Sequence, residues 1–197
     1  MKHRRALLIC LHRLLLALGC GAPAAAGAAD VGILVRDNTA FAFDLYHRLA
    51  ETNGNLFFSP YSISTALAMT CAGARGNTEK EMAATLRFTL PPEELHPAFG
   101  KMAAQIQEAQ DGRQLRLSVA NSLWPQKGHP FLDDYLSLVK KRYGVSITAV
   151  DFIQAKEAAR NRINDWVSSR TQERIQNLIQ PGVLDEQTRL VLVNAIY

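Results

Sequence analysis

The sequence predicts a chain of mixed helices and strands, an α/β protein, and three observations carry that prediction. Phe41, Leu45 and Leu49 recur at helical spacing, and similar apolar stripes appear in later segments. At 115–124 the apolar period changes to two, as in a strand with two different faces. Residues 190–197 are apolar at almost every position, which is typical of a strand covered on both sides. With 197 residues and 48% of them hydrophobic, the chain is long and apolar enough for one buried core.

The first 29 residues have the pattern of an export signal. Lys2, Arg4 and Arg5 precede an interrupted apolar run, and small residues follow as far as an Ala-x-Ala site. We expect a signal peptide over 1–29, cleaved near Ala28 or Ala29, and a secreted or extracellular protein, or a periplasmic or lipid-anchored one in a bacterium. Two alternatives stay open, a disordered Ala-rich extension and a lipoprotein leader modified at Cys20. The apolar run is too short to cross a bilayer as a helix of about 20 residues.

The distribution of charge argues against nucleic acid or a membrane surface as a partner. The chain has 22 basic and 18 acidic residues, but four of the basic residues lie in the leader. The remainder therefore has no net formal charge, and binding to a polyanion depends on a positive excess.

The elements of the first half are predicted from local signals. We expect a helix over Asn38–Ala50, a short buried strand at Leu56–Phe58, and a nearly all-apolar, buried helix over Pro60–Ala72 with Ser59 as its N-cap. Thr78 and Glu81 have the spacing of a capping box at the start of a helix that runs to Arg87. A further helix is predicted over Pro91–Gln110 and a turn at Asp111–Gly112.

The second half is predicted to alternate strands with helices. We expect strands at Leu115–Trp124, Ser146–Phe152 and Leu190–Tyr197, helices at Phe131–Tyr143 and Lys156–Ser169, and a loop over Thr171–Asp185. Gly144 follows the first of these helices directly, as a glycine that terminates a helix does.

No group of residues has the pattern of an enzyme active site, and we predict neither a cofactor nor a metal. Ser59 could be a nucleophile, but it lacks the flanking glycines of the G-x-S-x-G turn that presents the serine of a hydrolase. Its position before Pro60 is better explained by a role as the N-cap of the following helix. His47, His96 and His129 lack the spacing of metal ligands. After removal of the leader Cys71 is the remaining cysteine, so no intrachain disulfide forms, and its apolar surroundings predict a buried, inert thiol.

Two further segments could hold an anion, although each has a simpler explanation. The glycine-bearing segment 73–78 precedes a helix but lacks the Lys-Ser/Thr of a phosphate-binding loop, so an interhelix turn is the better interpretation. The basic residues 140–142 lie at the end of a predicted helix, where they interact favourably with the helix dipole on a solvated face.

Read in order, several segments resemble the serpin family. The resemblance runs from about Asn38 to Tyr197. It is carried by five stretches: Asn55–Ile63, Ala72–Thr78, Val119–Trp124, Ile163–Val167 with Thr171 and Ile175, and Leu190–Tyr197. It implies an α+β fold of helices packed on a large central β-sheet.

The resemblance also implies a function. Serpins are mostly inhibitors of serine proteases, and some inhibit cysteine proteases. A loop near the C-terminus is cleaved as bait and then inserts into the central sheet beside the strand that resembles Leu190–Tyr197. By the same resemblance Ser59, Ser62 and Asn194 form a structural polar cluster where the sheet opens. The alternative is a non-inhibitory member that acts as a carrier or chaperone.

We expect residues 30–197 to be the N-terminal portion of a serpin domain. No position of this sequence matches the bait loop, so the chain alone is expected not to inhibit. An open edge at the last strand would also favour self-association.

Overall fold

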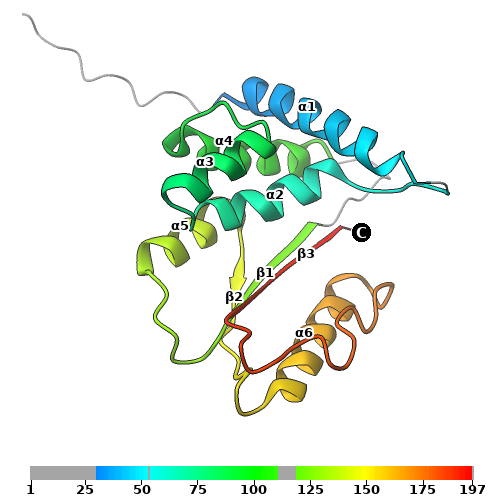
Figure 1. The fold of residues 1–197 in the computed structure, drawn as a ribbon, viewed down its shortest axis with the longest axis vertical. Helices are drawn as coiled ribbons and strands as arrows, with labels where there is room; N and C mark the ends of the chain where they lie inside the picture. The colour runs from blue at the N-terminus through cyan, green and yellow to red at the C-terminus, as the bar shows by residue number, and fades with distance from the viewer. Residues whose placement is uncertain (1–29, 53, 111–118, 197) are drawn as a thin grey trace, which may run out of the picture.

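The structure is a computed structural model that describes residues 30–52, 54–110 and 119–196. It places six helices and three strands in this part of the chain (Figure 1). The helices are α1 (Val31–Leu49), α2 (Pro60–Cys71), α3 (Gly76–Thr85), α4 (Pro92–Glu108), α5 (Asp133–Tyr143) and α6 (Lys156–Arg170); the strands are β1 (Val119–Pro125), β2 (Ser146–Ile147) and β3 (Leu190–Ile196). The predictions for the leader, for the turn at Asp111–Gly112 and for the first residues of the 115–124 strand lie outside the described residues.

The three strands form one mixed sheet in the order β2-β1-β3. The central strand β1 runs parallel to β2 and antiparallel to β3. In the antiparallel register Asn121 lies directly opposite Asn194. The sheet therefore brings two amide side chains together that are far apart in the sequence.

Each face of the sheet packs on its own hydrophobic core. Leu123 of β1 belongs to the core formed with α1, α2, α4 and α5, whereas the next residue, Trp124, belongs to the core formed with α6. Successive side chains of a strand point to opposite faces, so these two residues show that both faces of the sheet are covered. Figure 1 shows α6 apart from the other helices, across the sheet. The prediction that the 190–197 segment is covered on both faces is confirmed by Leu192 and Val193, which pack into the two different cores.

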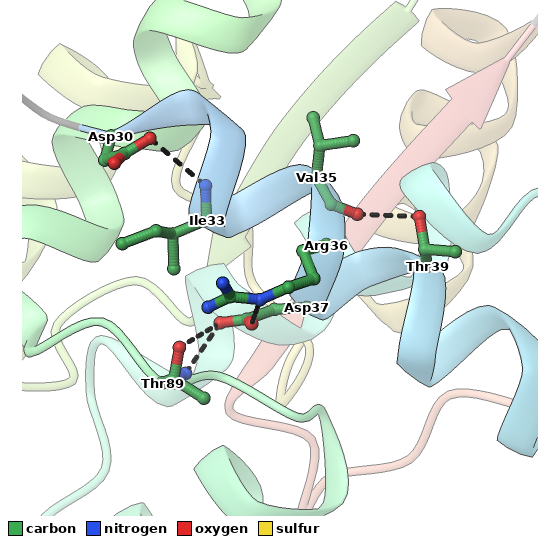
Figure 2. Close-up of polar contacts among 7 residues, drawn as sticks. All are labelled: Asp30, Ile33, Val35, Arg36, Asp37, Thr39 and Thr89. Atoms are coloured by element: carbon green, nitrogen blue, oxygen red, sulfur yellow. Dashed lines mark hydrogen bonds and ion pairs between the residues drawn. The ribbon is translucent and has the colours of Figure 1, made fainter.

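Helix α1 begins at Val31, seven residues before the predicted start. The Asp30 carboxylate caps it by accepting a hydrogen bond from the amide of Ile33 at 3.1 Å (Figure 2). The added turns bring Asp37 to the buried side of the helix. Its Oδ2 accepts from the amide and the hydroxyl of Thr89, at 2.8 and 2.7 Å, which ties α1 to the segment before α4.

The predicted strand at Leu56–Phe58 was wrong. This segment is irregular, and the side chain of Phe57 is 98% exposed. A strand requires a neighbour to accept its backbone hydrogen bonds, and no strand lies beside these residues in the described part of the chain.

The predicted capping box of Thr78 and Glu81 was also wrong. Helix α3 begins at Gly76, two residues before Thr78, so Thr78 lies within its first turn and no side chain caps the helix. Glu81 instead accepts a hydrogen bond from the side-chain amide of Asn77 at 2.6 Å.

The other elements agree with the sequence apart from their ends. Helix α2 has the predicted cap and Pro60 at its first position. Gly144 ends α5 with φ of 62°, a left-handed conformation that glycine adopts without strain. The strand predicted over Ser146–Phe152 is reduced to two residues plus an isolated bridge from Val150 to Gln126.

Candidate functional site

Three polar side chains meet where α2 packs against the sheet. The hydroxyl of Ser62, on α2, donates to Oδ1 of Asn194 on β3. The Nδ2 of Asn194 donates to Oδ1 of Asn121 on β1 at 2.6 Å. The Nδ2 of Asn121 in turn donates to the backbone carbonyl of Tyr143, at the end of α5, at 3.5 Å. We call Ser62, Asn121 and Asn194 the polar cluster.

The structure brings together two of the three residues that the serpin resemblance grouped. Ser62 and Asn194 are in direct contact, whereas Ser59 contacts the cluster indirectly. The hydroxyl of Ser59 accepts from the amide of Ser62 at 3.3 Å and so caps α2. Ser59 therefore fixes where α2 begins, and this sets the position from which Ser62 reaches β3.

Asn121 was not among the predicted members of the cluster. The available signal was a polar residue at an inward position of an alternating strand, in the same way that Asn194 is the one amide of an apolar strand. What local sequence does not give is the register that places the two asparagines opposite each other.

The cluster joins α2 to β1 and β3 through side chains, in addition to the backbone ladder that pairs the two strands. Amide and hydroxyl groups in a partly buried site must find partners, because a buried group without one is costly. Here each of the two asparagines uses both its oxygen and its nitrogen. The arrangement holds a helix on two strands, and it lacks the activated nucleophile and base of a catalytic site.

His96, one of the three histidines considered as metal ligands, has a structural partner. It is buried on α4, and its Nδ1 lies 2.6 Å from the hydroxyl of Tyr143. Burial, reinforced by Arg142 and Arg75, lowers the pKa of His96 to about 4. Burial is also the main cause that raises the pKa of the Tyr143 hydroxyl.

The remaining sequence candidates do not meet at one place. His47 and His129 are exposed, on α1 and in a loop. Residues 73–75 form the turn between α2 and α3, and the guanidinium of Arg75 donates to the carbonyl of Ala72 at 3.0 Å. The basic residues 140–142 form the last turn of α5.

Cys71 is buried and free, and burial followed by the charge of Glu79 raises the pKa of its thiol. Within residues 30–52, 54–110 and 119–196, no three His, Cys, Asp or Glu side chains are grouped as metal ligands would be. In the same ranges, no helix has the length and hydropathy needed to cross a bilayer.

The chain is similar to known proteins over most of its length. A family model described as Serpin (serine protease inhibitor) matches residues 36–197. Leukocyte elastase inhibitor of Sus scrofa is 44% identical over 162 residues, and that of Xenopus tropicalis is 45% identical over 161 residues; each alignment covers 81% of this chain and 42% of the relative.

Solved structures show the same fold. Ovalbumin from emu (Dromaius novaehollandiae) matches with a TM-score of 0.75 and 32% identity, over 85% of this chain and 46% of that one. A cleaved Serpin 42Da matches with a TM-score of 0.74 and 30% identity, over 84% of this chain and 43% of that one. The chain thus spans less than half the length of the proteins it matches.

Proposed function

This chain belongs to the serpin family, and on that premise we propose that the protein carrying it inhibits serine proteases. The observation that carries the proposal is the match of residues 36–197 to the serpin family model, together with solved serpin structures of the same fold. In the described residues β3 pairs with β1 along one edge, and the proposed strand would be added at its other edge.

The proposed mechanism is the one that family membership implies. A target protease cleaves an exposed loop of the intact protein, and the loop then inserts into the sheet as a new strand beside β3, a recognised case of strand addition. The polar cluster supports this role, because it lies at the junction of α2 with β1 and β3, where the sheet must adjust to accept a strand. No catalytic role is assigned to the chain.

The first target class to test is an elastase-type serine protease, since the relatives from Sus scrofa and Xenopus tropicalis are named for inhibition of leukocyte elastase. The full polypeptide that carries this sequence is incubated with such a protease and separated on a denaturing gel. An inhibitor gives a complex that survives SDS. Cleavage of the polypeptide without a complex, and without loss of protease activity, would contradict inhibition and favour the carrier or chaperone role.

We propose that the 197-residue chain does not inhibit when it is assayed alone. None of its positions resembles the bait loop, and loop cleavage is the step that traps the protease. An SDS-stable complex formed by this chain would refute the proposal. Size-exclusion chromatography of the same sample tests self-association through the edge of β3, for which we expect oligomers at micromolar concentration.

We propose that the protein is exported, with residues 1–29 removed as a signal peptide. The support is the order of basic, apolar and small residues in this segment. N-terminal sequencing of protein recovered from the medium should place the first residue close to Asp30. Recovery inside the cell with Met1 retained would contradict export, and a lipid on Cys20 would establish the lipoprotein alternative.

A further inference from the structure

The buried pair of His96 and Tyr143 joins α4 to α5. His96 is 5% exposed and Tyr143 is 8% exposed. Their rings lie edge to face with centroids 5.8 Å apart, and the Nδ1 to Oη distance is 2.6 Å. The Tyr143 ring also lies 5.6 Å from that of Phe99, so the pair is part of the packing between these two helices.

Tyr143 connects this pair to the polar cluster. Its side chain contacts His96, and its backbone carbonyl accepts from Asn121. Asn121 accepts from Asn194, and Asn194 accepts from Ser62. These contacts link α4, through the side chain and the backbone carbonyl of Tyr143 at the end of α5, to both strands and to α2.

The ionisable groups around the pair disfavour a positive charge on His96. Arg142 on α5 and Arg75 in the turn before α3 both raise the cost of protonating the ring. Cys71 and Tyr135 face Tyr143 and are neutral when protonated. In the described residues no carboxylate forms an ion pair with His96 that would offset the two arginines.

We propose that His96 and Tyr143 form an acid-sensitive latch that holds the polar cluster in place. Neutral His96 offers one ring nitrogen as an acceptor for the Tyr143 hydroxyl, whereas the protonated ring can only donate to the hydroxyl oxygen, so the hydroxyl hydrogen must turn away from it. The charged ring also lies beside two arginines in a buried site, which favours its release to solvent. When it leaves, Tyr143 and then Asn121 lose the contacts that fix them. His96 is a positioning residue here.

A cavity of about 150 Å³ borders Tyr143 and Asn121, the two residues that would move after the release of His96. The sign of the pH effect follows from the pKa of His96, which is about 4 in the closed state and about 6.5 when the ring is released. The released state binds more protons between these values, so the latch weakens as the pH falls through 6.5 and is weakest below 4.

Amide hydrogen exchange in the full polypeptide tests the latch without relying on protease inhibition. At pH 5 the pKa values of 4 and 6.5 shift the equilibrium toward the released state by up to about 20-fold relative to pH 7. After correction for intrinsic exchange rates, we expect the peptides containing β1 and β3 to exchange faster at pH 5 by up to this factor. His96→Gln keeps an acceptor and cannot be protonated, so its corrected exchange should not change with pH.

His47→Gln is the matched control, because His47 is exposed on α1. This variant should retain the full pH response. Equal pH responses in wild type and His96→Gln would overturn the proposal. If His96→Gln does not fold, an NMR titration of the wild type decides, because a His96 pKa above about 6 in the folded protein would overturn the latch and one near 4 would support it.

Discussion

Removing the Asn194 side chain should weaken the attachment of α2 to the sheet. The amide of Asn194 accepts from Ser62 and donates to Asn121 at 2.6 Å, so Asn194→Ala deletes two hydrogen bonds and leaves two partly buried polar groups without these partners. A typical hydrogen bond contributes about 1 kcal/mol and an orphaned buried group costs about 1–3 kcal/mol, so we expect the free energy of unfolding to fall by about 2–4 kcal/mol.

Urea denaturation followed by circular dichroism measures this loss. Asn161→Ala is the matched control, since Asn161 is exposed on α6, and its effect should stay within about 0.5 kcal/mol. A double-mutant cycle with Ser62→Ala isolates the pair, for which we expect a coupling energy of about 1–2 kcal/mol. If Asn194→Ala and Asn161→Ala have equal stabilities, or if the cycle shows no coupling, the polar cluster does not hold α2 on the sheet.

Three further predictions concern other contacts. A Cβ added at Gly100 would lie 2.8 Å from the backbone oxygen of Arg142, so Gly100→Ala should push α4 from α5 and lower the unfolding free energy by about 1–3 kcal/mol; unchanged stability would mean that the helices are not this close. Asp37→Ala should cost about 1–2 kcal/mol in urea denaturation because Thr89 loses its acceptor, whereas Asp37→Asn should cost less; equal costs would contradict the role of the acceptor oxygen. Cys71 should react slowly with a thiol reagent in the folded protein and rapidly in urea, as followed by mass spectrometry of its peptide; equal rates would contradict its burial.

Signals contained within a few residues predicted the structure well. Ser59 followed by Pro60 locates the start of α2, because a cap and its helix are neighbours in the chain. Gly144 locates the end of α5 for the same reason. The alternation at 115–124 predicted a strand, and β1 confirms it over Val119–Trp124, while Leu123 and Trp124 contact two different cores.

Features that depend on distant partners were harder to predict. The run Leu56–Phe58 has the composition of a strand, but without a neighbouring strand it stays irregular and exposes Phe57. The Thr78–Glu81 spacing fits a capping box, yet α3 had already begun at Gly76. Asn121 joined the polar cluster through the register of β1 with β3, which the sequence of either strand alone does not contain.

The most direct test of the proposed function is amide hydrogen exchange on β3 before and after proteolysis. The full polypeptide is cleaved by an elastase-type serine protease, and exchange is followed in the peptide covering Leu190–Ile196. If a cleaved loop inserts beside β3, the amides of this strand that do not bond to β1 gain acceptors, so their exchange should slow while the exposed segment around Phe57 stays unchanged. Exchange on β3 that is unchanged or faster after cleavage would contradict insertion at this edge.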